Sequence, residues 1–131
     1  MLYFEKIKDY LLEMGFTIDQ ENEDELLVVV NDPERGINNL VIDCEDPILI
    51  LEQVIIPLPK ASEKIYKRLL QMNRGLVHGA FCLDDPDDKI LLFRDTLQLK
   101  NLDPNELEGS IDALSLAMAE HGTELLSFVG K

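Results

Sequence analysis

The segment that most constrains the fold of this chain is ILILEQVIIPLP at residues 48–59. It is the most apolar and most β-branched stretch of the sequence, and such a stretch is typical of a long strand in the interior of a sheet. Pro57 and Pro59 end the strand, because proline has no N–H to donate to a neighbouring strand. The rest of the chain must therefore supply the strands and helices that bury it.

Five further segments predict shorter strands. FTIDQ (16–20) and ELLVVVND (25–32) are joined by acidic residues that we interpret as a solvated turn, and INNLVIDC (37–44) follows a DPERG turn. In INNLVIDC the apolar side chains from Leu40 onwards alternate along the segment, as on a strand with one buried face. VHGAFCLD (77–84) and KILLFRDTLQL (89–99) flank a polar cluster, so they predict a β-hairpin.

Two amphipathic segments predict helices in the first two thirds of the chain. Residues 2–14 carry apolar side chains at steps of three and four and stop at Gly15, where a C-terminal cap is expected. A second helix lies within KASEKIYKRLLQMNRGL (60–76) and ends near 73–75.

The third predicted helix has the clearest start signal in the chain. Asp103, Pro104 and Glu106 stand where the N-terminal cap and the first and third helical residues would be. An apolar stripe at steps of three and four then runs to Phe128. Gly122 predicts a break before that end, because glycine weakens a helix interior.

The order of these elements defines the fold class. It is helix, four strands, helix, strand hairpin, helix, without a linker or a repeat in 131 residues. We therefore expect a single α+β domain over residues 1–131 with a mainly antiparallel sheet. A dinucleotide-binding fold would need single strands alternating with helices, and that pattern is absent. A core of this size needs no disulfide or metal for stability.

Charge limits the classes of partner. The chain has 12 Lys and Arg against 26 Asp and Glu, for a net charge of -14. Such a surface repels phosphate backbones and anionic lipids, so we expect neither nucleic acid nor membrane as a partner. The sequence shows no signal peptide or apolar membrane span, and Cys44 and Cys82 form no CxxC pair. We therefore expect a cytoplasmic protein without a structural disulfide.

No segment carries a recognisable catalytic motif. GxGxxG, the phosphate loop, GxSxG and HExxH are all absent from the sequence. His78 and His121 lie in a strand and on an apolar helical stripe, and we interpret them as core or interface residues. Cys44, His78 and Cys82 do not predict a zinc site, because positions 78 and 82 would be about 13 Å apart along a strand and no fourth ligand is evident.

The aspartates between the last two strands resemble a calcium loop only in composition. An EF-hand loop needs an oxygen ligand at its third position and glycine at its sixth, where this chain has Pro86 and Lys89. We interpret residues 84–88 as a solvated hairpin tip. We accordingly predict no catalytic residue, no cofactor and no metal ligand, and expect that the protein is not an enzyme.

Two features suggest contact with a partner. Cations gather in and beside the second helix, which is either an ordinary solvated face or a docking face for an acidic segment, such as one of a second copy. The apolar strand at 48–56 belongs to a sheet that three helices can cover only in part, so apolar surface should be left for association. The predicted partner-binding residues are Val54, Ile56, Lys60, Lys64 and Lys67.

The second half of the chain resembles a known family. The matching pattern is a helix ending in Leu-Leu-x-x-Asn, a strand hairpin ending in Leu-x-Leu, and a long helix that starts after Leu-Asp. The matching positions are Leu69, Leu70, Asn73, Phe81, Leu83, Leu92, Leu97, Leu99, Leu102, Asp103 and Leu107. This pattern is similar to that of the YbjN-like and Tir-chaperone-like proteins, which resemble the class I chaperones of type III secretion.

The resemblance implies a small acidic cytoplasmic α+β protein. It implies a homodimer that binds a polypeptide client without ATP and has no catalytic residues. The alternative is a regulatory or small-ligand-sensing domain of the same fold.

Overall fold

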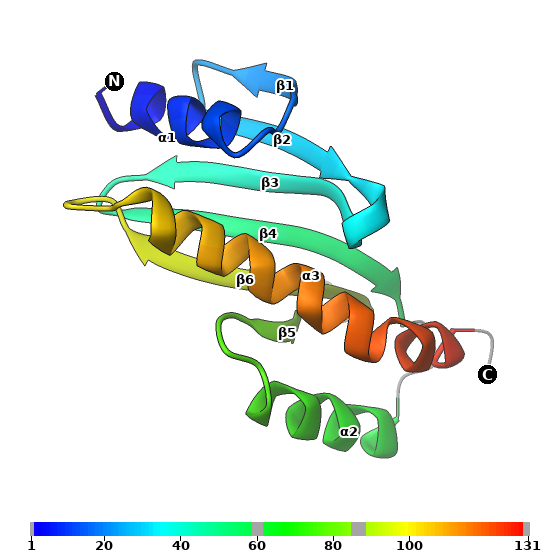
Figure 1. Cartoon of the computed structure of the whole chain (residues 1–131). Coiled ribbons are helices and arrows are strands. Elements are labelled where there is room, and N and C mark those ends of the chain that lie inside the picture. Colours follow the sequence, from blue (N-terminus) through cyan, green and yellow to red (C-terminus); the bar gives the residue numbers. More distant parts are fainter. Residues whose placement is uncertain (1, 59–61, 85–88, 130–131) are drawn as a thin grey trace.

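A computed structural model describes residues 2–58, 62–84 and 89–129 of the chain (Figure 1). The elements predicted from the sequence are all present and in the predicted order. They are α1 (Leu2–Glu13), β1 (Ile18–Asn22), β2 (Leu27–Asp32), a 3-10 turn η1 (Pro33–Arg35), β3 (Ile37–Glu45), β4 (Ile48–Pro57), α2 (Glu63–Arg74), β5 (Ala80–Leu83), β6 (Ile90–Gln98) and α3 (Pro104–Ser127).

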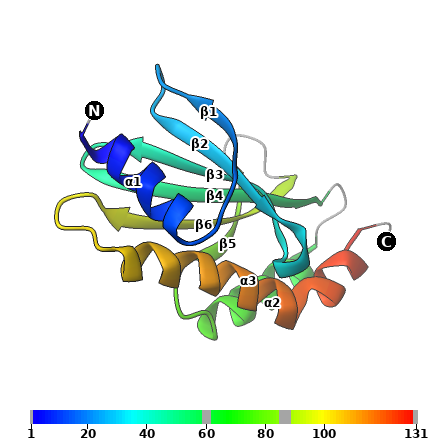
Figure 2. The same ribbon diagram turned by 45° about the horizontal axis from the view of Figure 1, so that its top comes forward.

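The strands form one antiparallel sheet in the order β1-β2-β3-β4-β6-β5. The predicted interior position of the long apolar strand is confirmed, because β4 pairs with β3 on one side and with β6 on the other. α1 and α3 lie over one face of the sheet, and α2 lies beside the β5 edge, next to the end of α3 (Figures 1 and 2). The mixed helix and antiparallel sheet fold is thus the predicted one.

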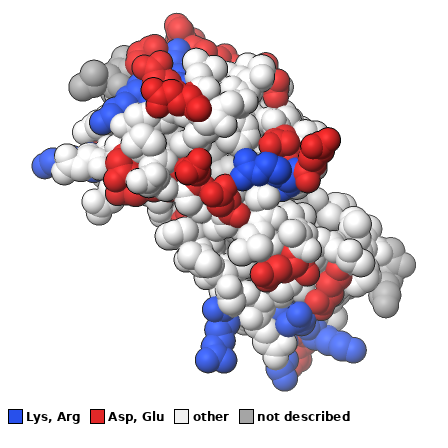
Figure 3. Space-filling model, viewed as in Figure 1, with Lys and Arg blue, Asp and Glu red and all other residues white. Residues whose placement is uncertain are grey.

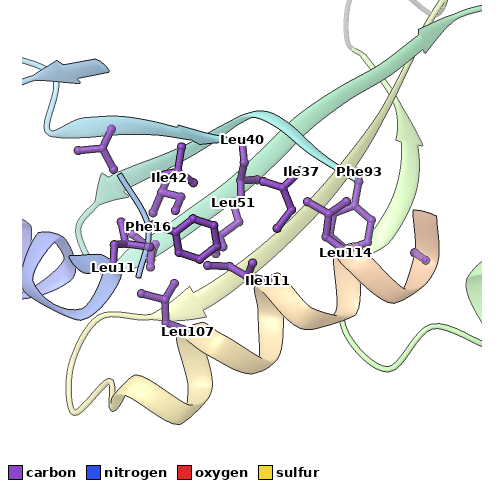
Figure 4. Packing of buried hydrophobic residues seen from close by; sticks show 14 of the residues in the cluster. Leu11, Phe16, Ile37, Leu40, Ile42, Leu51, Phe93, Leu107, Ile111 and Leu114 are labelled. Carbon is purple, nitrogen blue, oxygen red and sulfur yellow. The ribbon is translucent and has the colours of Figure 1, made fainter. Parts of the chain in front are cut away.

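The core lies between the sheet and its helices, mainly α1 and α3, and α2 adds Leu69 and Met72 to it. Alternate residues of β3 and β4 point to this side, including Leu40 and Ile42 from β3 and Leu51 from β4 (Figure 4). The helices meet them with Leu11 of α1 and with a stripe along α3 that includes Leu107, Ile111 and Leu114. We call this side of the sheet the covered face.

The long helix α3 starts as predicted and ends later than predicted. The side chain of Asp103 accepts a hydrogen bond of 3.0 Å from the backbone N–H of Glu106, which confirms the cap. The expected break at Gly122 is wrong, since α3 continues to Ser127. Beyond the glycine, Leu125 is only 1% exposed. Burial of this side chain offsets the roughly 1 kcal/mol that glycine costs in a helix.

Gln53 is a buried polar residue in the middle of β4. Its amide group donates to the backbone carbonyl of Gly36 at 3.0 Å and accepts from the backbone N–H of Asn38 at 2.9 Å. It therefore satisfies two main-chain groups at the start of β3, and it holds the η1 corner against the sheet.

Candidate partner-binding surfaces

The side of the sheet opposite α1 and α3 is the first candidate surface, and we call it the open face. Paired residues in an antiparallel sheet share a face, so the register gives its members. Val41 is paired with Glu52, Asp43 with Ile50, and Glu52 with Arg94. Together with Asn38, Asn39 and Val54 they line a hollow of about 610 Å³ that crosses three strands.

Apolar and acidic side chains alternate on the open face. Val54 is 61% exposed, while Glu52 accepts a 2.9 Å hydrogen bond from Arg94. Asp43 is half-buried, and its Oδ1 atom has no hydrogen-bond partner among the described residues. The open face therefore has an apolar floor that is interrupted by carboxylates.

The environment of Asp43 disfavours its charged form. Burial raises the pKa of Asp43 to about 6, and hydrogen bonding with the Glu45 carboxyl contributes next. The negative charges of Glu45, Glu25 and Glu52 raise the pKa further. The Oδ1 atom of Asp43 is thus shielded from water, and no described cation forms an ion pair with this carboxylate.

The second candidate surface is formed by α2 and the end of α3. Lys and Arg side chains gather at the α2 end of the molecule (Figure 3). Lys64 and Lys67 line a groove of about 680 Å³ whose floor includes Ile65 and Phe128. Arg68 donates to Glu124 of α3 at 2.7 and 3.0 Å, and this contact holds the pKa of Glu124 below its usual range. Arg68 therefore joins two helices, whereas Lys64 and Lys67 remain exposed to solvent.

An apolar shoulder lies on α2 and the segment that follows it. Its members are Tyr66, Leu70 and Val77, and the last two are 71% and 72% exposed. Tyr66 and Leu70 border a hollow of about 300 Å³ that is lined almost entirely by apolar side chains of α2 and the hairpin. Sequence reasoning missed this shoulder, although Leu70 stands off the apolar stripe of its helix and could have indicated it.

Asn73 closes the outer edge of β5 beside this shoulder. Its side-chain amide donates to the backbone carbonyl of Phe81 at 3.0 Å, and it accepts from the backbone N–H of Phe81 at 2.7 Å. These are the two main-chain groups that a further strand would use. At Phe81 the outer edge of β5 is therefore satisfied by one side chain of α2.

The residues predicted to bind a partner lie on two surfaces. Val54 is on the open face, and Lys64 and Lys67 line the α2 groove. Lys60 lies outside the described residues. Ile56 is 8% exposed and belongs to the core, so we remove it from the predicted contact residues.

A register shift explains why Val54 and Ile56 point in different directions. Val54 pairs with Leu92 of β6, and Ile56 pairs with Leu91. Between these two pairs β4 therefore has one residue more than β6. Such a bulge turns the following residue to the other face of the sheet. The alternation that holds for residues 48–54 therefore does not extend to residue 56.

Both thiols and the ring of His121 lie in packing environments. Burial raises the pKa of the Cys44 thiol to about 11 and also raises the pKa of Cys82, and both disfavour a reactive thiolate. The His121 ring packs edge-on against Phe81 with ring centres 6.2 Å apart. Within the described residues, no three His, Cys, Asp or Glu side chains are grouped so as to hold a metal ion.

No helix within the described part of the chain is both long enough and apolar enough to span a membrane.

Comparison with known proteins gives a family and several related folds. The family model described as CesT_Tir_1 matches residues 1–131. No curated protein matches. Among solved structures, YbjN from E. coli, titled a putative transcription regulator, is 14% identical with a TM-score of 0.69, and the match covers 93% of this chain and 92% of that one.

Two chaperone structures share the fold as well. The HopA1-SchA chaperone-effector complex is matched with 11% identity and a TM-score of 0.67, over 91% of this chain and 92% of that one. The Yersinia pestis type III secretion chaperone SycH, in complex with a fragment of YscM2, is matched with 14% identity and a TM-score of 0.61, over 89% and 98%. At these identities the matches show a common fold.

Proposed function

The chain belongs to the CesT_Tir_1 family, and from that premise we propose that it binds polypeptide clients as a chaperone-like homodimer, without ATP and without catalysing a reaction. The observation that carries this proposal is the open face, where Val54 is exposed in a hollow that crosses three strands. Exposed apolar patches with a polar rim commonly mark protein-binding sites. A cytoplasmic location is part of the proposal.

Structural relatives support a polypeptide as the bound species. One related structure is the HopA1-SchA chaperone-effector complex, the other is the chaperone SycH with a fragment of YscM2, and both share this fold. The proposal carries that type of partner over to this chain. It identifies no individual client.

For the homodimer, we propose the apolar shoulder as the interface. Leu70 on α2 and Val77 in the segment after it are large apolar side chains that are mostly exposed. Two copies that each carry a charge of -14 repel one another, and the approach is least unfavourable through the end that holds Lys64 and Lys67.

Light scattering after gel filtration tests the homodimer. We expect twice the mass of the chain for the wild type and the monomer mass for Leu70→Glu with Val77→Glu. Leu12→Glu is the matched control, because Leu12 is also an exposed leucine but lies on α1. A wild-type monomer at tens of micromolar, or a dimer that survives the double substitution, would contradict this interface.

Client binding is tested by recovering bound polypeptides from a lysate and identifying them by mass spectrometry. The wild type should retain a small reproducible set, and Val54→Glu should lose that set while Leu12→Glu keeps it. Equal retention by Val54→Glu would remove the open face from the proposal.

A second candidate function is the sensing of a small ligand, and the α2 groove favours it. Its volume of about 680 Å³ lies in the range of small-molecule sites, and Lys64 and Lys67 would suit an anion. Calorimetric titration with small carboxylates and phosphates would separate the two functions. Saturable binding that is lost in Lys64→Gln with Lys67→Gln would favour ligand sensing.

A further inference from the structure

The open face differs from an ordinary uncovered sheet surface in its charge. Within its hollow, Asp43 and Glu52 supply carboxylates, and the one described cation lining the hollow, Arg94, is already paired with Glu52 at 2.9 Å. Glu45 lies beside Asp43 at the next outward position of β3. The hollow therefore presents negative charge that no described cation neutralises.

Asp43 is the point at which an incoming cation would gain most. Its Oδ1 atom is shielded from solvent and accepts no hydrogen bond among the described residues. A buried acceptor without a partner costs free energy, and a donor that reached it would recover that cost. A lysine or arginine side chain would supply both the missing hydrogen bond and the opposite charge.

The floor of the hollow sets the second requirement on a partner. Val41, Ile50 and Val54 lie on adjacent strands and border the acidic positions. A purely hydrophilic cation would leave these side chains in water. A chain segment with both apolar and basic residues satisfies the floor and the carboxylates together.

A second copy of this chain fits the open face poorly. Packing two open faces about a two-fold axis that passes through the hollow would bring Asp43 and Glu52 of one copy close to the same residues of the other. Juxtaposed like charges in an interface cost several kcal/mol. The proposed dimer also uses the apolar shoulder, which leaves the open face accessible.

We propose that the open face binds a client segment that combines apolar with basic side chains, and that Asp43 selects the basic residue by accepting a hydrogen bond from it. This rests on the proposed function, because it specifies the chemistry of the client that the protein binds. Glu52 and Arg94 border the same site, and because they pair with each other, the Oδ1 atom of Asp43 is left as an acceptor without a partner among the described residues.

Fluorescence anisotropy with three labelled twelve-residue peptides tests the proposal on the full chain. All three alternate valine or isoleucine with a second residue, which is lysine in one peptide, glutamine in the next and glutamate in the last. The lysine peptide should bind about tenfold more tightly than the glutamine peptide, and the glutamate peptide should bind more weakly still. Added salt should weaken the lysine peptide most.

Variants of the chain then assign the effect to Asp43. Asp43→Asn should weaken the lysine peptide about tenfold and leave the glutamine peptide nearly unchanged. Glu34→Gln is the matched control, since it removes one negative charge from an exposed site at η1 that borders α3. It should leave both affinities unchanged.

The outcomes separate this inference from the proposed function. Equal affinity for the lysine and glutamate peptides, or an unchanged lysine affinity in Asp43→Asn, would overturn the inference. If clients recovered from a lysate are retained equally by Asp43→Asn, the inference fails while the proposed function stands. If the wild type retains no polypeptide at all, both fail. A change of oligomer mass in Asp43→Asn would assign the open face to a second copy and would also overturn the inference.

Discussion

The two faces of the sheet are built from the same strands but are composed differently. On β4, Leu49 and Leu51 point to the covered face and are almost fully buried, whereas Ile50, Glu52 and Val54 point to the open face. On β3 the same contrast separates Ile42 from Asp43. The covered face is almost entirely apolar, with Gln53 as its buried polar exception, and the open face mixes aliphatic with charged side chains.

This contrast shows that apolar content alone does not define a core. Carboxylates within the apolar floor of the open face would oppose a permanent cover, because each buried charge needs a partner. They permit contact with a segment that brings its own cations. The following substitutions test whether the two faces differ as described.

The largest effect is expected on the covered face. Leu51→Ala removes a buried side chain and leaves a cavity against the helices, so the free energy of unfolding should fall by about 2 to 5 kcal/mol. Urea denaturation measures it. Val54→Ala, on the open face of the same strand, should change stability by less than about 0.5 kcal/mol. Equal losses at the two positions would contradict the contrast.

The second largest loss of stability is expected from replacing the buried amide of Gln53. Gln53→Leu keeps the volume of the side chain but leaves the Gly36 carbonyl and the Asn38 N–H without their partner, so a loss of about 1 to 3 kcal/mol is expected. Faster hydrogen exchange of the Asn38 amide should accompany it. Gln98→Leu, at an exposed position on β6, is the control and should leave both unchanged.

Removing a charge from the open face should raise the free energy of unfolding, in contrast to the two substitutions above. The pKa of Asp43 is about 6 in the folded protein against an ordinary value of 3.8, so the folded state holds this proton more tightly and loses stability as pH rises from about 4 to 6. The shift corresponds to about 3 kcal/mol, and solvent screening reduces it to about 1 kcal/mol. Asp43→Asn should therefore be about 1 kcal/mol more stable than the wild type at pH 7.5.

Urea titrations at several pH values check this prediction. The advantage of Asp43→Asn should shrink as pH falls and vanish near pH 4, where the wild-type carboxyl is protonated in the folded state. Glu34→Gln, at an exposed site, should run parallel to the wild type throughout. A constant difference between Asp43→Asn and the wild type at all pH values would show that charge is not its cause.

The smallest effect on stability should come from Val54→Thr. This change keeps the shape of an exposed side chain and should alter the free energy of unfolding by no more than about 0.5 kcal/mol. It should still weaken binding of the apolar and basic peptide severalfold, because the floor of the hollow becomes polar. Unchanged peptide affinity would show that the peptide does not contact Val54.

Local sequence signals predicted most of the fold. The strands followed from alternation and from the apolar run of β4, and the start of α3 followed from Asp103 and its neighbours, because each signal depends on residues close together in the chain. The end of α3 could not be predicted from its local sequence. Gly122 is a local signal, whereas the burial of Leu125 depends on residues far away in the sequence.

Less of the candidate site than of the fold could be predicted from the sequence. Val54 and Ile56 are two apart and would share a face in a regular strand, but the bulge between them depends on how β4 pairs with β6. The unpartnered acceptor of Asp43 likewise depends on which carboxylates the neighbouring strands bring beside it. Long-range pairing of this kind leaves no signal in a single segment.

The pair of hydrogen bonds from Asn73 to Phe81 bears on how the protein behaves when it is concentrated. An apolar edge strand can pair with a strand of another chain and so begin a cross-β assembly. Here the Asn73 amide is hydrogen-bonded to the N–H and the carbonyl of Phe81, the groups with which an added strand would pair. The Asn73 side chain thereby opposes the addition of another chain to this protein at Phe81 of β5.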